Sequence, residues 1–214
     1  MKPAYWDEAT RTLGKSDRVL RRLIRAYPDL HLKRRSDPFT TLARAIVGQQ
    51  ISVKAADSVW RRFVAAVAPG ARPAAFPQLD SRTVATTGIA ALRQCGLSER
   101  KAEYLRDLAR HFASGALNPK GWRRLDDEAL IAALVEVKGI GRWTAEMFLI
   151  FHELRADVLP VDDIGLQRAV ALHYHGGTRV TPAAIRELAL GWQPYRSVAT
   201  WYLWRSLDPV PVEY

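Results

Sequence analysis

Cysteine is nearly absent from this sequence, since Cys95 is the only one in 214 residues. A single thiol excludes an internal disulfide framework, and it excludes a four-cysteine zinc or iron–sulfur site within the chain. Long hydrophobic runs are missing as well, so no segment is predicted to span a bilayer. The first residues, Met-Lys-Pro-Ala-Tyr-Trp-Asp-Glu, are polar and include acids, which is unlike a signal or transit peptide. We therefore expect no membrane association and a cytoplasmic location, or a nuclear one if the source is a eukaryote.

Acidic residues are outnumbered by basic ones. Lys and Arg total 32 against 22 Asp and Glu, which gives a net charge of +10 and a pI of about 10.1. Such a charge favours a polyanionic partner, with nucleic acid as the first candidate. Arginine supplies 25 of the basic residues, and its guanidinium binds phosphates bidentately and stacks on bases. A genome rich in G and C would also enrich arginine codons, so the arginine content alone does not decide.

No strand pattern is found, and the hydrophobic spacing is helical nearly everywhere. The sequence therefore predicts an all-α fold of about ten short helices. Capping residues predict helix starts at Asp37-Pro38, Ser52, Ser98 and Thr181-Pro182. Other helices are predicted around Leu20, Ile24 and Tyr27 (the first helix) and over 126–137, 142–151, 164–174 and 194–204. Another face of that first helix carries Arg18, Arg21, Arg22 and Arg25.

The most informative segment runs from Leu134 to Ala145. An apolar helix is predicted to end there, Gly139-Ile140-Gly141 to form a turn, and a second helix to start at once. Glycine permits positive φ and close backbone approach, and the N-terminus of the second helix suits a phosphate. A short Gly-x-Gly is more often an ordinary tight connection between helices. The longer string Val-x-Gly-Ile-Gly-x-x-Thr-Ala is far more specific.

This string resembles the helix–hairpin–helix DNA-binding motif. Downstream, Leu159-Pro160-Val161-Asp162-Asp163 places an aspartate twenty residues after Trp143. Together these resemble the helix–hairpin–helix–Gly/Pro–Asp superfamily of base-excision DNA glycosylases. The segments Ala45–Ser52, Gly96–Leu105 and Trp192–Trp204 are similar to signatures of its alkylbase branch, the DNA-3-methyladenine glycosylase II type. The resemblance spans about residues 38–205.

The resemblance implies a two-lobed helical bundle with an active-site cleft between the lobes. We expect residues 1–214 to form a single glycosylase unit, with one lobe of about 38–120 and another of about 1–37 and 121–214. Longer family members carry an extra N-terminal β domain, which we expect to be absent here. The implied partner is duplex DNA containing alkylated bases, bound by a monomer in the cytoplasm (at the nucleoid of a bacterium).

By resemblance Asp163 is the catalytic carboxylate, which would stabilise positive charge on the sugar as the base leaves. The alternative is that Asp163 only caps the helix over 164–174. Asp162 is the rival acid, and the family spacing favours Asp163.

Position 143 separates two chemistries within the superfamily. Bifunctional members have a lysine there, which forms a Schiff base with the sugar. Trp143 cannot, so the resemblance implies a monofunctional enzyme without lyase activity. Trp143 and Trp204 match aromatic residues of the base pocket, and an aromatic face attracts a cationic alkylpurine. Met147 and Ile164 replace aromatic residues of the family's long form, which favours 3-methyladenine and 7-methylguanine over bulkier adducts such as 1,N6-ethenoadenine.

DNA contacts are implied for two segments. Gln50 matches the residue that fills the hole left by the flipped base, with Gln49 beside it; the alternative is that both glutamines cap the preceding helix end. The hairpin residues expected at the phosphate backbone are Lys138, Gly139, Gly141, Arg142 and Thr144. The carbonyls of Val135, Val137 and Ile140 match positions that hold Na⁺ or K⁺ in family complexes with DNA. No other cofactor is expected.

Two further functions stay open from the sequence. One is a glycosylase of the same fold for another lesion, such as hypoxanthine, uracil or a mismatched base, because pocket shape decides the lesion. The other is a DNA-binding module without chemistry, although binding alone requires neither the carboxylate nor the aromatic pocket.

Overall fold

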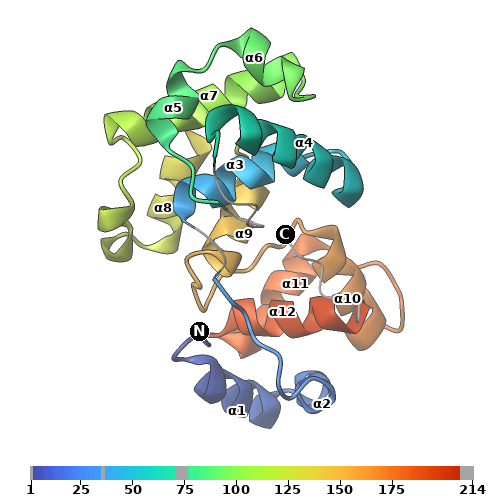
Figure 1. Cartoon of the computed structure of the whole chain (residues 1–214). Coiled ribbons are helices and arrows are strands. Elements are labelled where there is room, and N and C mark those ends of the chain that lie inside the picture. The colour runs from blue at the N-terminus through green and yellow to red at the C-terminus, as the bar shows by residue number, and fades with distance from the viewer. Residues whose placement is uncertain (1, 35–36, 71–76, 208–214) are drawn as a thin grey trace. The chain divides into compact units, whose positions relative to one another are not determined.

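The computed structural model describes residues 2–34, 37–70 and 77–207. Within these residues the chain forms twelve α-helices and two short 3₁₀ helices, with no strand (Figure 1). The predicted all-α class is confirmed. None of the described helices is both long and apolar enough to cross a membrane.

The chain divides into two compact units by its internal contacts. The middle unit is residues 35–148, and the terminal unit is residues 1–34 with 149–214. The middle unit contains α3 (Pro38–Gly48), α4 (Val53–Val67), α5 (Ser81–Thr86), α6 (Ile89–Gln94), α7 (Glu99–Ser114), η1 (Pro119–Arg124), α8 (Asp127–Val135) and most of α9 (Arg142–Phe151). The terminal unit contains α1 (Trp6–Ser16), α2 (Arg18–Ala26), α10 (Ile164–Tyr174), α11 (Pro182–Leu188), η2 (Ala189–Trp192) and α12 (Arg196–Leu207).

Side-chain caps set the starts of many helices. Asp37, Ser52, Ser98 and Thr181 each accept a hydrogen bond from the backbone N–H three residues later, at 3.0–3.3 Å. These N–H groups have no partner within the helix, so a side-chain oxygen at the N-cap stabilises the first turn by about 1 kcal/mol. The four predicted helix starts are confirmed.

Aromatic side chains connect the helices of the middle unit. Phe39 of α3 meets Phe112 of α7, Phe112 meets Trp122 of η1, and Trp122 meets Phe148 of α9, with ring centroids 5.4, 6.1 and 5.5 Å apart. Edge-to-face pairs of this kind add about 0.5–1.5 kcal/mol beyond area burial. This chain of rings fixes α9 against the core of the unit. α9 is the helix that the sequence predicts to follow the hairpin turn.

The terminal unit is built around α12. Its residues from Ser197 to Leu203 are all buried, and Trp201 and Tyr202 contact Trp6 of α1. Asp17 caps α2 through Leu20 N, and its carboxylate also accepts from the Tyr174 hydroxyl at 2.8 Å. The two ends of the chain are thus joined in one core.

The structure corrects several helix boundaries. The predicted first helix is preceded by α1, whose buried residues Trp6, Ala9 and Leu13 recur at helical spacing. The helix predicted over 126–137 ends at Val135, because the backbone turns there into the hairpin. The last helix begins at Arg196 rather than 194.

The division into units also differs from the one that the sequence predicts. Residues 121–148 belong to the middle unit, whereas the sequence grouped them with the chain ends.

Candidate functional site

The predicted hairpin is a tight turn between α8 and α9. Val137 N donates to Leu134 O at 3.2 Å, and Ile140 N donates to Val137 O at 3.0 Å. The side chains of Val137 and Ile140 are 1% and 3% exposed. Burial of these two residues fixes the turn to the core of the middle unit, while α9 begins directly after it at Arg142.

The two glycines of the hairpin have different surroundings. Gly139 has φ +85°, and a Cβ at this position would overlap the ring of Tyr104. Gly141 is exposed, and a Cβ at this position would meet no atom within 4 Å apart from those of its immediate chain neighbours. Gly139 is therefore required by the conformation and packing of the turn. Gly141 leaves the backbone at the start of α9 open to an approaching group.

Polar side chains from two other helices hold the hairpin. Gln49, at the end of α3, donates from Nε2 to Gly139 O at 2.9 Å. The Asp107 carboxylate of α7 accepts from Lys138 N at 2.9 Å. The Gln49 side chain thus bonds to the hairpin and not to its own helix end. Gln50 beside it is exposed and has φ +57°.

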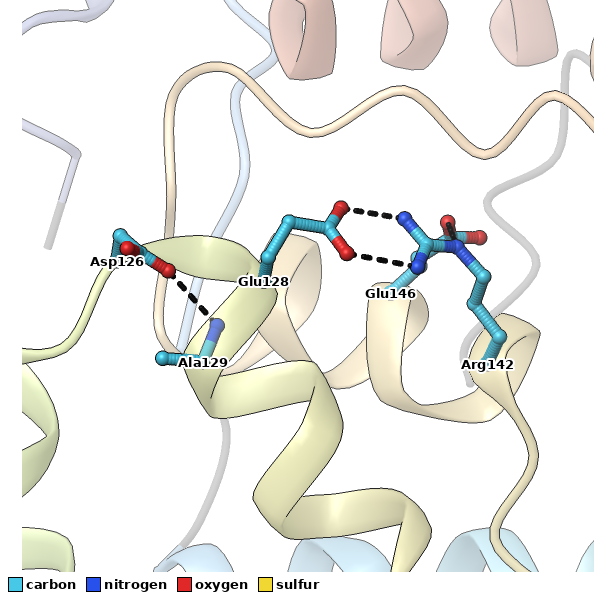
Figure 2. A network of polar contacts seen from close by, with 5 residues as sticks. All are labelled: Asp126, Glu128, Ala129, Arg142 and Glu146. Carbon is cyan, nitrogen blue, oxygen red and sulfur yellow. Dashed lines mark hydrogen bonds and ion pairs between the residues drawn. The ribbon is translucent and has the colours of Figure 1, made fainter.

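Arg142 lies between two carboxylates at the start of α9 (Figure 2). Its guanidinium donates to both Glu128 oxygens at 2.8 and 2.5 Å and to Glu146 Oε1 at 2.9 Å. The hydrogen bonds and charge of Glu128, followed by those of Glu146, raise the pKa of Arg142, and Arg142 lowers the pKa of Glu128. The predicted phosphate ligand is therefore part of a clamp between α8 and α9 in the structure, while the Lys138 side chain is exposed and Thr144 is half-buried.

Two predicted pocket residues lie one turn apart on α9. Trp143 is 41% exposed, whereas Met147 is 8% exposed. Residues four apart on a helix share a face, so both side chains belong to the same side of α9. The Trp143 ring thus presents exposed aromatic surface at the start of α9 in the middle unit.

Asp163 is the N-cap of α10 in the terminal unit. Its Oδ1 accepts from Leu166 N at 2.7 Å and from the indole nitrogen of Trp204 at 2.7 Å. The capping role that the sequence offered as an alternative is thus present. Capping does not exclude a catalytic role for Asp163, because the same two N–H donors fix the orientation of its half-buried carboxylate. Asp162 is exposed.

Trp204 is held by its ring as well as by its nitrogen. The ring stacks on Phe151 with centroids 5.6 Å apart and planes inclined by 14°. A Cβ at Gly165 would lie 3.0 Å from Asp163 Oδ1 and 3.1 Å from Trp204 Cδ1. The absence of a side chain at Gly165 therefore makes room for the Asp163–Trp204 hydrogen bond. Ile164, the other predicted pocket residue here, is 71% exposed.

The structure thus brings Gln49 to the hairpin in one unit, and Asp163, Ile164 and Trp204 together in the other. Sequence reasoning missed the supporting residues, which are Tyr104, Asp107, Phe151 and Gly165. For one of them, Gly165, the sequence does contain a signal of its role. Glycine within a helix is disfavoured by about 1 kcal/mol relative to alanine, so Gly165 in the first turn of α10 indicates a close approach.

Comparison with known proteins agrees with this arrangement. The family model described as the HhH-GPD superfamily base excision DNA repair protein matches residues 43–194, which include both the hairpin and Asp163. The chain belongs to this superfamily. Among HhH-GPD proteins, DNA-3-methyladenine glycosylase 1 of Schizosaccharomyces pombe is 31% identical, over 91% of this chain and 83% of the relative. DNA-3-methyladenine glycosylase 2 of Escherichia coli is 33% identical, over 87% of this chain and 64% of the relative.

Solved HhH-GPD structures share the fold over nearly the whole chain. The 3-methyladenine DNA glycosylase of S. pombe in complex with abasic DNA superposes with a TM-score of 0.79 at 29% identity, covering 97% of this chain and 98% of that one. The DNA-3-methyladenine glycosidase of Bacillus halodurans superposes with a TM-score of 0.84 at 33% identity, covering 94% and 89%.

Proposed function

We propose that this HhH-GPD protein is a monofunctional DNA glycosylase that acts as a monomer on duplex DNA. It flips out alkylated purines, with 3-methyladenine and 7-methylguanine as substrates, and leaves an abasic site. The names of its relatives support the substrate class. The observation that carries the proposal is the Asp163 carboxylate held by Trp204 and by the first turn of α10.

A fixed carboxylate suits the breaking of the bond between base and deoxyribose. As this bond breaks, positive charge develops on the sugar. A carboxylate already oriented by two N–H donors stabilises that charge without reorganising during the reaction. The same carboxylate can orient the water that attacks the sugar.

The aromatic residues fit a cationic base. A purine alkylated at N3 or N7 carries a formal positive charge, which is attracted to the face of a tryptophan by about 0.5–2 kcal/mol. Trp143 presents an exposed ring, and Trp204 has a ring fixed by Phe151. Because the charge also makes the base a good leaving group, an aromatic pocket and Asp163 suffice without a dedicated general acid.

The residue at position 143 argues for base release without strand cleavage. A Schiff base with the sugar requires an amine, and Trp143 has none. Lys138 belongs to the exposed surface of the hairpin, where its charge is suited to a phosphate.

In this proposal the hairpin binds the phosphate backbone of DNA. The exposed backbone at Gly141 and the N-terminus of α9 suit a phosphate through N–H groups and the helix dipole. The carbonyls of Val135, Val137 and Ile140 lie in or next to the same turn, and a carbonyl such as that of Val137 keeps a second lone pair beside its hydrogen bond to Ile140 N. These carbonyls would hold Na⁺ or K⁺, whose charge would neutralise the phosphate.

The test is base release from methylated duplex DNA under single-turnover conditions. Wild type is expected to release 3-methyladenine and 7-methylguanine, and the strands should stay intact until alkali treatment. Asp163→Asn keeps an oxygen that can accept from Leu166 N and Trp204 but removes the charge. We expect its release rate to fall by about 10²-fold or more, with duplex binding retained.

Asp162→Asn is the matched control, because it removes the neighbouring exposed carboxylate and should leave the rate unchanged. Slower release of 1,N6-ethenoadenine than of 3-methyladenine is expected, since Met147 and Ile164 offer no aromatic face. If wild type releases neither methylated purine, or if Asp163→Asn keeps full activity, the proposal is wrong.

A further inference from the structure

The backbone at Gln50 has an unusual conformation. Its φ of +57° lies in the left-handed region, where residues other than glycine are uncommon. Its side chain is exposed, directly after the end of α3. A residue in such a conformation persists only where its surroundings hold it.

Lys101 of α7 supplies that hold. Its Nζ donates to Val47 O at 2.8 Å and to Gln49 O at 2.7 Å. These carbonyls lie at the C-terminal end of α3, where backbone oxygens lack helical partners and a cation is favoured by the helix dipole. The Gln49 carbonyl belongs to the peptide plane whose rotation about the N–Cα bond of Gln50 defines φ of Gln50. The ammonium therefore fixes one side of the left-handed bend.

The same face of α7 also holds the hairpin. Tyr104, one turn after Lys101, packs against Gly139, and Asp107, one turn further, accepts from Lys138 N. The Gln49 side chain connects the end of α3 directly to the hairpin, since its amide donates to Gly139 O. The end of α3 and the hairpin are thus fixed by a single helix and by each other.

We propose that Lys101 is a positioning residue for base excision, which holds Gln50 in the conformation that enters the duplex when the base is flipped. This inference rests on the proposed glycosylase function and on Gln50 as the residue that fills the vacated space. Lys101 acts through the backbone of α3 and touches neither the base nor the sugar. Its loss should slow base flipping and excision while leaving the affinity for undamaged DNA unchanged.

The experiment compares Lys101→Met with Lys101→Arg and with Arg110→Met. Methionine keeps the length of the side chain without its donors, whereas arginine restores N–H donors. Arg110→Met removes a positive charge from an exposed position on the same helix. We expect Lys101→Met to lower the single-turnover release rate about tenfold, Lys101→Arg to recover most of it, and Arg110→Met to change nothing.

Two further readouts separate positioning from folding or phosphate binding. Flipping is followed by the fluorescence of 2-aminopurine beside the lesion, and affinity by anisotropy with undamaged duplex at several salt concentrations. Lys101→Met should reduce the fluorescence change and leave the salt dependence as in wild type. Weaker binding of undamaged DNA, with a salt slope reduced by about one, would identify Lys101 as a phosphate ligand and overturn the proposal.

A double-mutant cycle with Gln50→Ala tests whether Lys101 acts through Gln50. In the Gln50→Ala background, Lys101→Met should change the rate less than twofold. A full tenfold effect in that background would overturn the proposal. Failure of wild type to release any methylated base would instead reject the proposed function, so the two failures are distinguishable.

Discussion

The indole of Trp204 makes two contacts, one with the Asp163 carboxylate and one with the Phe151 ring. The indole nitrogen donates to the carboxylate, while the ring stacks on Phe151. These two contacts leave the indole little freedom to rotate. A tryptophan that is fixed in this way also fixes the orientation of the carboxylate, and Gly165 makes the geometry possible because it has no side chain in the space beside both groups.

Gly165→Ala tests this arrangement at the scale of one methyl group. The added Cβ would meet Asp163 Oδ1 and Trp204 Cδ1 at 3.0–3.1 Å, so one of the two side chains must shift. We expect the single-turnover release rate to fall about tenfold, a loss of ~1.4 kcal/mol in transition-state stabilisation. Thermal stability should change little, because the gain in helix propensity of up to ~1 kcal/mol offsets the tight contact.

Gly191→Ala is the matched control, since it lies in the same unit with no atom near its added Cβ and no positive φ. It should keep the wild-type rate. Equal rates for Gly165→Ala and wild type would show that the Asp163–Trp204 geometry tolerates displacement.

At the scale of elements, α7 holds both the hairpin and the end of α3 within the middle unit. Lys101 bonds to the end of α3, Asp107 bonds to the hairpin, and Tyr104 packs against Gly139. The Arg142 clamp adds a second connection, between α8 and α9. The hairpin is therefore held by side chains of α7, α8 and α9 and by Gln49 at the end of α3.

Replacing each hairpin glycine by alanine should affect a different property of the protein. Gly139→Ala forces a Cβ into the Tyr104 ring and a left-handed φ on alanine, so we expect a loss of at least ~1–2 kcal/mol in the free energy of unfolding. Gly141→Ala meets nothing and should stay within ~0.5 kcal/mol of wild type. Its affinity for duplex DNA should nevertheless fall, because the methyl group occupies the open approach to the backbone.

Urea unfolding and fluorescence anisotropy with an undamaged duplex measure these two effects. Each variant serves as the control for the other. If Gly141→Ala binds DNA as wild type does, the hairpin backbone is not the phosphate contact.

At the scale of the whole molecule, a dense run of positive charge lies on α2, which has four arginines and no acidic residue among its nine residues. Arg18, Arg21, Arg22 and Arg25 of α2 line a hollow of about 300 Å³. Within the described part of the chain, none of the four forms an ion pair with a carboxylate. Arg21 donates to the carbonyls of Gly14 and Lys15, whereas Arg18 and Arg25 are exposed. A charge run of this kind is either a solvated face or a second contact for the phosphate backbone.

Salt dependence decides between these two interpretations. We expect the double variant Arg18→Gln/Arg25→Gln to reduce the slope of log affinity against log salt by about two, since each phosphate contact contributes roughly 0.9. The double variant Arg179→Gln/Arg186→Gln removes the same charge from exposed positions elsewhere in the terminal unit and should keep the wild-type slope. Equal slopes for both double variants would assign the α2 arginines to a solvated face.

Local features were readable from the sequence. Caps such as Asp37 and Ser98, the helix over 142–151 and the Gly139–Gly141 turn depend on residues within a few positions of one another, so the pattern is contained in a short segment. The helix 6–16 was missed although its apolar spacing is regular. The roles of the individual site residues, Asp163 included, stay predictions that the experiments above address.

The sequence by itself determined the helical class, the hairpin and the family, because each is encoded in local patterns or in a motif. Only the tertiary structure decided which groups hold these features in place. Gln49 and Gly139 are 90 residues apart, and Asp163 and Trp204 are 41 apart. Contacts at such separations depend on how helices pack, and packing is set by the whole core rather than by the residues that meet.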